Sequence, residues 1–554
     1  MKHYVAPQHS LSSGSPSARQ LVTKPRMVSR QMRVATIALI PALSAVAAPP
    51  AGFNERVESL RKLFGVPGVS IAIVENGQTT LAKGYGIRKL DRPEPVGPDT
   101  IFQTGSTGKA FTVAALATLV DEKKIKWDDQ VIDHMPDFRM YDPWVTREVT
   151  IRDLLVHRSG LGLGAGDLLF VPRSDLSRKE TVRRLRYIKP TTSFRYTFAY
   201  DNILYMAAGQ LIEEVTGQSW ETYISEKIFK PAGMLHSTEQ DETRLATIDR
   251  ATPHARLNGP IRGLGDQEPL DETTDRAQNS APAGGLAISA NDMSRWLLIQ
   301  LAHGKLPGGK DMRMFSEESS VEMWHPVLLQ AIDPWPEYLK PTQPMFYTYA
   351  LGWDVQDYRG TKLIWHGGAV FGSLAAVVLM PEKNVGFFIA ANSEEGELVR
   401  GLMFELLDHY LGLPKGDWPE KLHTYKTDKL NEAVKTLQKE TAQPAKVGPS
   451  LPLERYAGEY NDPWYGTIKI HLDNNRNLVI DFPHSFGLNA ALDHWQYDTF
   501  RTRFADKNFE PAYVTFNLDA AGNIEQITMK AVSPDADFSW DYQDLLFRPT
   551  TTKK

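Results

Sequence analysis

The sequence contains no cysteine. This absence excludes disulfide bonds, thiolate metal sites and a cysteine nucleophile, so the folded chain depends on its core alone. Positive charge is not in excess either, because 62 Lys and Arg residues stand against 67 Asp and Glu residues, for a formal net charge of −5. That balance disfavours a general nucleic-acid-binding surface and predicts no nucleic-acid partner.

Apolar runs of membrane length are missing as well. The stretch 34–47 (VATIALIPALSAVA) is shorter than the roughly 20 residues that a membrane helix needs, and Pro41 interrupts it. It follows a basic segment without acidic residues and ends in Ala45-Val46-Ala47, which matches a signal-peptidase site. We predict a signal peptide at 1–47 and an exported, periplasmic or secreted protein with no stable membrane span after cleavage. An uncleaved anchor stays open as an alternative, and so does a start at Met27 or Met32.

The rest of the composition is typical of globular proteins. Hydrophobic residues make up 42% of the 554 residues and charged residues 23%. At roughly 100 to 200 residues per domain, a chain of this length predicts more than one folding unit.

Strand patterns occur at both ends of the first part of the chain, with helical patterns between them. Residues 69–74 and 79–84 predict a hairpin around the turn Asn76-Gly77. Apolar residues recur at helical spacing in three segments: 106–120, 202–215 and 290–302. Three further strands are predicted at 362–366, 374–380 and 385–391. The pattern indicates a mixed sheet with a helical lobe.

The composition changes after residue 414. Residues 415–450 are charged and end in a Pro- and Gly-containing stretch, which predicts a linker with a helix near 429–440. Beyond it, short alternating runs between turns predict a small β-barrel or sandwich at 451–550. The predicted strands are 456–460, 466–471, 478–482, 500–504, 512–518 and 524–530.

Ser106 and Lys109 form a Ser-x-x-Lys pair at a predicted helix start. Three residues are nearly one helical turn, so the lysine shares a face with the serine and can approach its hydroxyl. A hydroxyl needs such a proton acceptor to become a nucleophile, and the helix N-terminus favours a developing oxyanion. A phosphate-binding loop is rejected, because Gln103 and Ala110 occupy positions where that motif requires Gly and Ser or Thr.

Two further elements carry polar groups suited to the same chemistry. Tyr200 and Asn202 precede the second predicted helix; a nearby lysine could lower the pKa of the tyrosine, and the amide can bind a carbonyl. His366-Gly367-Gly368 ends a predicted strand, where the glycines would let a substrate backbone lie along the strand edge. No spacing of metal ligands is present, so we predict neither a metal site nor a cofactor.

The order of these three elements resembles one family. From about Phe53 to Gly412 the chain resembles the serine β-lactamase and penicillin-binding-protein superfamily, in the branch of class C β-lactamases, D-aminopeptidases and family VIII esterases. The likeness includes further segments: 154–161 (LLVHRSGL), 215–217 (VTG), 228–234 (IFKPAGM), 283–286 (AGGL) and 292–297 (DMSRWL). It implies an α+β fold: a β-lactamase-like mixed domain at 51–414, in which helices flank an antiparallel sheet beside a helical lobe, then a small C-terminal antiparallel β-barrel.

The resemblance also implies roles for individual residues. Ser106 would attack a carbonyl to form an acyl-enzyme, and Lys109 with Tyr200 would move its proton, with the identity of the base left open. The backbone N–H groups of Ser106 and Ala369 would form the oxyanion hole. Asn202 would hold the substrate amide or the Lys109 ammonium. His157 and Ser159, in the segment 154–161, are interpreted as structural support.

One departure from the family pattern concerns the substrate. β-Lactamases and penicillin-binding proteins usually carry Lys-Thr-Gly where this chain has His366-Gly367-Gly368. A histidine is largely neutral near pH 7 and offers no permanent cation for a substrate carboxylate. We therefore expect an esterase or D-amino-acid peptidase acting on a small ester, amide or peptide, with at most weak β-lactamase activity, and a His366 that hydrogen-bonds Tyr200 or shuttles a proton. The alternative is a non-catalytic, penicillin-binding-like receptor for cell-wall fragments or acyl ligands.

The C-terminal segment resembles a lipocalin-like extension found on some of these hydrolases. The likeness is carried by 456–460 (YAGEY), 463–466 (PWYG) and 494–500 (HWQYDTF). Its aromatic residues are interpreted as core and turn anchors, with a ligand cavity as the alternative. A third option is that this domain covers the mouth of the active site and limits substrate size.

Overall fold

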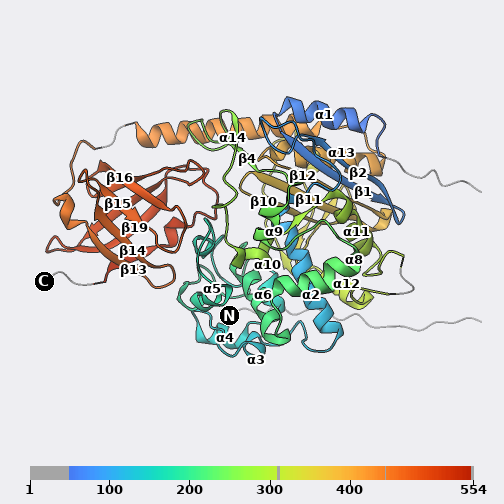
Figure 1. Cartoon of the computed structure of the whole chain (residues 1–554), viewed down its shortest axis with the longest axis horizontal. Coiled ribbons are helices and arrows are strands. Elements are labelled where there is room, and N and C mark those ends of the chain that lie inside the picture. The colour runs from blue at the N-terminus through green and yellow to red at the C-terminus, as the bar shows by residue number, and fades with distance from the viewer. Residues whose placement is uncertain (1–48, 309–311, 443–444, 551–554) are drawn as a thin grey trace, which may run out of the picture. The chain divides into compact units, whose positions relative to one another are not determined.

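A large antiparallel sheet forms the centre of the first part of the chain (Figure 1). The computed structural model describes residues 49–308, 312–442 and 445–550, so the predicted signal peptide lies outside the described residues. The sheet has eight strands in the order β2-β1-β12-β11-β10-β9-β8-β7. Their bounds are β1 (Gly68–Glu75), β2 (Gln78–Gly86), β7 (Leu328–Leu329), β8 (Tyr347–Tyr349), β9 (Asp354–Tyr358), β10 (Thr361–Val370), β11 (Ser373–Met380) and β12 (Val385–Ala391).

Strands from the beginning and the end of this domain's sequence pair with each other inside the sheet. The predicted hairpin of β1 and β2 turns at Asn76-Gly77, where both residues have positive φ, as its turn type requires. β1 then pairs with β12, so that Val69 lies opposite Ala391. The first strand therefore completes the sheet that the last three strands begin.

Helices cover both faces of the sheet, which is why β1 is apolar along its whole length. Ile71 and Ile73 point to a core shared with α1 (Phe53–Leu63) and α13 (Gly396–Leu411). Ala72 and Val74 point to the opposite core, shared with α2 (Lys109–Asp121), α6 (Ile203–Thr216) and α11 (Ala290–Leu301). A strand buried on both faces loses the alternation of a half-exposed strand.

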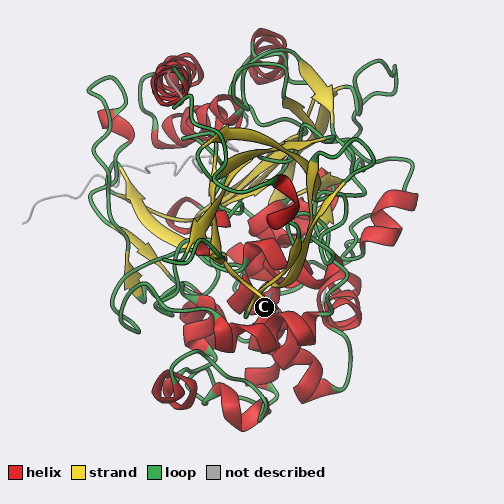
Figure 2. Cartoon of the chain, turned by 90° about the vertical axis from the view of Figure 1, so that its left-hand side faces the viewer, coloured by secondary structure: helices red, strands yellow, loops and turns green. Residues whose placement is uncertain are grey.

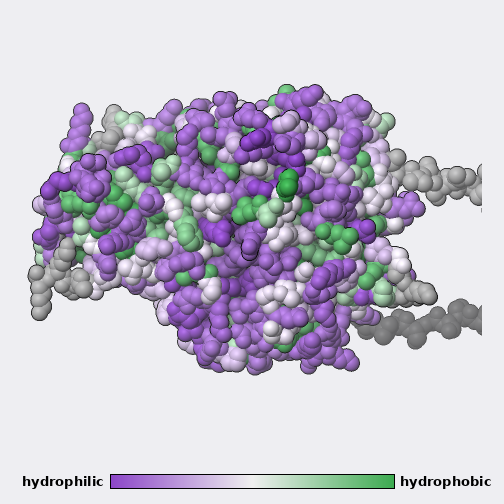
Figure 3. All heavy atoms as spheres, viewed as in Figure 1, coloured by the Kyte–Doolittle hydropathy of each residue, from purple (hydrophilic) through white to green (hydrophobic). Residues whose placement is uncertain are grey.

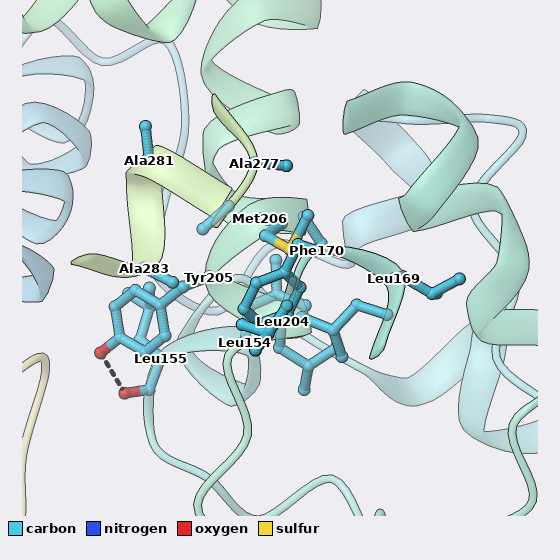
Figure 4. Close-up of a cluster of buried hydrophobic side chains, with 14 of the residues drawn as sticks. Leu154, Leu155, Leu169, Phe170, Leu204, Tyr205, Met206, Ala277, Ala281 and Ala283 are labelled. Atoms are coloured by element: carbon cyan, nitrogen blue, oxygen red, sulfur yellow. Dashed lines mark hydrogen bonds between the residues drawn. The ribbon is translucent and has the colours of Figure 1, made fainter. Parts of the chain in front are cut away.

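The helical lobe packs around α2 and α6. Residues 109–119 of α2 are all buried. Figure 4 shows Leu204 and Met206 of α6 packed beside Leu154 and Phe170, and the Tyr205 hydroxyl donating to the Leu155 carbonyl at 2.7 Å. The remaining helices of this part are α3 (Val131–His134), α4 (Pro143–Glu148), α5 (Arg178–Arg184), α7 (Trp220–Ile224), α8 (Lys230–Ala232), α9 (Asp241–Ala246), α10 (Ala281–Gly284) and α12 (Glu317–Met323).

Two small strand pairs join the sheet and the helices. β3 (Phe102–Gln103) pairs with β6 (Ala287–Ile288), and β4 (His254–Arg256) pairs with β5 (Gln267–Pro269). The first pair leads directly into the turn that carries Ser106.

The segment after α13 is a long helix. α14 (Trp418–Thr441) begins well before the helix expected near 429–440. The indole N–H of Trp418, the first residue of α14, donates to Asp408 of α13 at 2.6 Å. Lys426 of α14 forms an ion pair with Glu397 of α13. These contacts with α13 explain how a mostly polar segment forms 24 residues of helix.

Eight strands after α14 close into an antiparallel barrel, seen from its own side in Figure 2. Two of its strands, β16 and β20, were not predicted: β16 contains the polar pair Asp493-His494, and β20 is short and ends in a proline. The strands are β13 (Gly458–Asp462), β14 (Gly466–Leu472), β15 (Leu478–Asp481), β16 (Asn489–Gln496), β17 (Thr499–Phe504), β18 (Ala512–Leu518), β19 (Ile524–Ala531) and β20 (Leu546–Pro549). The predicted α+β sheet domain followed by a small barrel is confirmed.

Hydrophilic residues dominate the face drawn in Figure 3, with hydrophobic residues scattered among them. Within the part of the chain that the structure describes, none of the helices combines the length and apolar character needed to span a bilayer.

The sheet meets the helical lobe at a point with no room for a side chain on β10. A Cβ added to Gly368 would lie 1.9 Å from the Thr104 carbonyl oxygen, whereas one added to the neighbouring Gly367 would meet only the Trp365 ring, at 3.7 Å. Backbone at that distance has to move before the larger residue fits.

We therefore expect Gly368→Ala to lower the free energy of unfolding by on the order of 3 kcal/mol, through overpacking of backbone on backbone. Gly367→Ala, its matched control, should change this free energy by less than about 1 kcal/mol. Urea titration of both variants beside the wild type measures the difference. Equal stabilities of the two variants would contradict the close approach.

Candidate active site

Ser106 lies in a tight turn at the boundary between the sheet and the helical lobe. Residues Gly105–Gly108 form a single 3-10 turn that continues directly into α2. Gly105 has φ 52°, and a Cβ there would lie 2.6 Å from the backbone nitrogen of Ala369 on β10. Only glycine meets both demands, so this residue holds the Ser106 turn against the strand.

Lys109 is fully buried one turn after Ser106. Its Nζ donates to Ser106 Oγ at 3.2 Å, to Asn202 Oδ1 at 2.8 Å and to the Ala283 carbonyl at 2.7 Å. Burial lowers the pKa of Lys109 to about 7, and the nearby carboxyls of Asp167 and Asp201 oppose this shift only in part. The amine can therefore exchange a proton with the serine near neutral pH.

Tyr200 lies across the same amine. Lys109 Nζ is 4.6 Å from the centre of the Tyr200 ring. The tyrosine is enclosed by protein, and burial raises the pKa of Tyr200 well above its ordinary range, although the Ser106 hydroxyl works against this rise. The expected lowering of this pKa by Lys109 is therefore wrong, because desolvation is the larger effect. Tyr200 is a phenol here, suited to donate a proton.

Asn202 holds the lysine. Its Oδ1 accepts from Lys109, and its Nδ2 donates to Asp167 Oδ2 at 3.0 Å. The sequence analysis considered two partners for Asn202, the substrate amide and the Lys109 ammonium. The structure shows the contact with Lys109. Asp167 fixes which way the amide points, since a carboxylate oxygen accepts only from the NH₂ group.

His366 forms its hydrogen bond with a residue that the sequence analysis did not identify. Its Nε2 lies 2.8 Å from the Tyr349 hydroxyl, while its ring centre is 6.4 Å from that of Tyr200. The expected His366–Tyr200 hydrogen bond is therefore wrong, because Tyr349 of β8 occupies that side of the imidazole. Burial lowers the pKa of His366 to about 3, so the side chain is neutral near pH 7.

β10 runs through the glycine pair instead of ending at His366, and its last part has a free edge. β9 pairs with β10 only as far as Trp365, while β11 pairs with it from Ile364 to Val370. Among the described strands, none pairs with residues 366–370 on the side that β9 leaves. Such an edge can accept an extended ligand backbone.

A cavity of about 800 Å³ opens at this edge. Most of the predicted site residues line it: Ser106, Tyr200, Asn202, His366, Gly367, Gly368 and Ala369. Lys109 lies behind the wall. The structure thus brings all eight predicted site residues together. Across the described chain, no cluster of three or more His, Asp or Glu residues is arranged to hold a metal.

The segment 154–161 supports this wall from behind. His157 Nδ1 accepts from the backbone N–H of Asp201 at 3.2 Å, and its ring centre lies 4.3 Å from that of Tyr200. Ser159 donates to the Asp201 carboxylate at 3.2 Å. Burial raises the pKa of Asp201 to about 7. These contacts position Tyr200 and Asn202 on either side of Asp201.

Sequence reasoning missed several residues at the site. Asp167, Tyr349, Phe538 and Ser539 all lie within one or two contacts of the predicted residues. No local motif marks them, because each reaches the site from a different part of the chain. Ser539 and Phe538 come from the barrel domain.

Comparison with known proteins agrees with this fold. The Beta-lactamase family model matches residues 53–411, and a domain of unknown function, DUF3471, matches residues 442–549. The chain belongs to the β-lactamase family, within the superfamily of serine β-lactamases and penicillin-binding proteins.

Individual relatives extend this result. An unguisins hydrolase of Aspergillus campestris is 30% identical over 451 residues, covering 77% of this chain and 78% of that protein. Penicillin-binding protein 4 of Amycolatopsis lactamdurans is 27% identical over 373 residues, covering 65% of this chain and 89% of that protein. The octameric penicillin-binding protein homologue from Pyrococcus abyssi has the same fold, with a TM-score of 0.54 and 22% identity over 86% of this chain and 97% of that one.

The buried amine makes the reactivity of Ser106 depend on pH. Below about pH 7 the Lys109 amine is protonated and cannot accept the serine proton; above it the amine is neutral. We expect the rate of Ser106 labelling by a fluorophosphonate to rise about tenfold per pH unit below this pKa and to level off above it. Intact mass spectrometry from about pH 5.5 to 9 measures this rate.

Lys109→Met serves as the control, because it removes the titrating group and should label slowly at every pH. A wild-type rate that stays constant between about pH 6 and 8 would contradict the role of this amine.

Proposed function

We propose that this protein is an exported serine hydrolase that forms an acyl-enzyme on Ser106 with a small ester or amide. The observation that carries the proposal is the contact of Lys109 Nζ with Ser106 Oγ, at 3.2 Å, beside a cavity of about 800 Å³. A buried amine with a pKa near 7 is matched to taking a proton from a serine at neutral pH.

We assign the chemical roles in proton transfer to two groups, Lys109 and Tyr200. Ser106 Oγ attacks the substrate carbonyl carbon while its proton passes to the neutral Lys109 amine. The raised pKa of Tyr200 favours the phenol, so this residue relays the proton to the leaving group. The acyl-enzyme then reacts with water, which gives its proton to the same groups in reverse, and the free acid leaves.

We assign the oxyanion of each step to the space between the turn and the strand. Its donors are the Ser106 N–H in the 3-10 turn before α2 and the Ala369 N–H on β10; this assignment is supported by Gly105, which lets the turn pack against the backbone of Ala369. Two such donors, fixed before the reaction begins, stabilise the negative charge that develops on the substrate oxygen. Gly367 leaves the strand edge open for the substrate backbone, whereas Gly368 lets the Thr104 backbone pack against β10.

The neutral His366 favours esters and D-amino-acid amides over β-lactams. The position where the family commonly carries a lysine holds an imidazole whose pKa is about 3, so it supplies no positive charge for a carboxylate. The hydrolase among the relatives supports turnover, and the penicillin-binding protein supports the capacity to be acylated.

Ser106→Ala should abolish labelling by a fluorophosphonate and by a fluorescent penicillin, and should lower p-nitrophenyl ester turnover by at least about 10³-fold, because no other group can form the acyl bond. Intact mass measures labelling, and absorbance measures turnover. The matched control is Ser294→Ala, which removes a buried hydroxyl that donates to Asn291 within α11.

Wild-type protein that neither labels nor turns over any ester or D-amino-acid amide would contradict the proposal and favour a receptor. Labelling by the penicillin without measurable turnover would do the same.

A further inference from the structure

The loop between β19 and β20 of the barrel reaches the active site. The barrel and the sheet domain belong to one compact unit. Ser539 of this loop donates its hydroxyl to Asp167 Oδ2 at 2.9 Å. The Asp541 carboxylate accepts from the backbone N–H groups of Gly166, at 2.7 Å, and Leu168, at 3.1 Å. Side chains of two barrel residues, Ser539 and Asp541, therefore hold the segment that carries Asp167.

Asp167 is itself connected to the reacting groups. The same oxygen that accepts from Ser539 accepts from Asn202 Nδ2 at 3.0 Å. The opposite end of that amide accepts from Lys109, whose Nζ also contacts Ser106. A chain of four hydrogen bonds thus runs from Ser539 through Asp167, Asn202 and Lys109 to the nucleophile. Asp167 is buried. It links the barrel to the sheet domain, because it accepts from Ser539 of the barrel and from Asn202 of the sheet domain.

Phe538 adds an apolar wall beside the proton relay. Its ring meets the Tyr200 ring edge-on, with centres 6.0 Å apart and an interplanar angle of 72°. Its backbone lies on Gly164, where a Cβ would come within 2.7 Å of the Phe538 carbonyl oxygen. Phe538 is 38% exposed and lines the same cavity as Ser106. A substrate group on that side would lie against this ring.

We propose that the C-terminal barrel contributes two residues to the function of the active site. Ser539 positions Lys109 through Asp167 and Asn202. Phe538 limits the size of the substrate group that binds beside Tyr200. This inference rests on the proposed function. It assigns the barrel a role in both rate and specificity, while the chemistry stays with Ser106.

The first experiment measures kcat and KM for a p-nitrophenyl ester with four full-length proteins. Ser539→Ala should lower kcat/KM on the order of 10-fold, mainly through kcat, because a hydrogen bond in the chain that orients the base is lost. Ser539→Thr retains the hydroxyl and should recover most of the rate. Ser533→Ala, on the same loop, removes a hydroxyl that only accepts from the Asp535 backbone N–H and should match the wild type.

The pH profile separates a positioning role from a general loss of structure. Lys109 is faced by the carboxyls of Asp167 and Asp201, the imidazoles of His157 and His366, and the phenol of Tyr200. Burial raises the pKa of Asp167 to about 8, so this carboxyl is largely protonated over the acid limb of kcat/KM with or without Ser539. The acid limb should therefore keep its wild-type pH in Ser539→Ala while kcat falls, and Ser539→Thr should recover the rate. Unchanged kinetics, or an acid limb displaced from the wild-type pH, would overturn the positioning role.

The second experiment compares Phe538→Ala with the wild type on esters of increasing acyl size. The ratio of kcat/KM for a phenylacetyl ester to that for an acetyl ester should rise on the order of 10-fold, because the ring no longer occupies that space. A ratio that stays at the wild-type value would overturn the specificity role of Phe538.

Hydrogen exchange tests the barrel contact independently of activity. Amides in 164–170 should exchange faster in Asp541→Ala, which removes the acceptor of two of them, and the same peptides are compared in Ser539→Ala in case the first variant does not fold. Unchanged protection in both would overturn the proposal. Protein without Ser106-dependent turnover would instead contradict the proposed function, and the exchange data would still decide whether the barrel holds this segment.

Discussion

The site depends on the burial of one lysine amine. Lys109 lies at the start of α2 with no access to solvent, and its three acceptors are all protein oxygens. In water these acceptors would be replaced by solvent and the amine would remain protonated at neutral pH. Inside the protein, desolvation opposes them and brings the pKa of Lys109 to about 7. Ser106 and Asn202 contact this amine directly, and Asp167 holds the Asn202 amide in place.

The cavity lies where the Ser106 turn packs against β10 and where β9 stops pairing with β10. Gly105 and Gly368 let the Ser106 turn and β10 meet backbone to backbone. β9 stops pairing with β10 after Trp365, so the edge of β10 on that side is open from His366 to Val370. The proposed oxyanion donors and the open edge thus lie in the same local geometry. A larger residue at either glycine would disturb both together.

The barrel contributes to this geometry from the far end of the sequence. Asp167 receives hydrogen bonds from Asn202 of the sheet domain and from Ser539 of the barrel. Burial raises the pKa of Asp167 to about 8 and of Asp541 well above its ordinary range, so the two carboxyls share a poorly solvated region where their hydrogen bonds matter most. Docking of the barrel and orientation of the lysine are therefore parts of one polar network.

The sequence by itself determined the features that depend on neighbouring residues. The hairpin at Asn76-Gly77, the common face of Ser106 and Lys109 and the period-two strands follow from local geometry, and the family motifs placed the remaining site residues in order. Only the tertiary structure decided the pKa of Lys109, the phenol form of Tyr200 and the pairing of His366 with Tyr349. It also joined Ser539 to Asp167. These features arise from burial and from contacts between distant segments, and neither can be read from residue type or spacing, because desolvation depends on what the whole fold packs around a group.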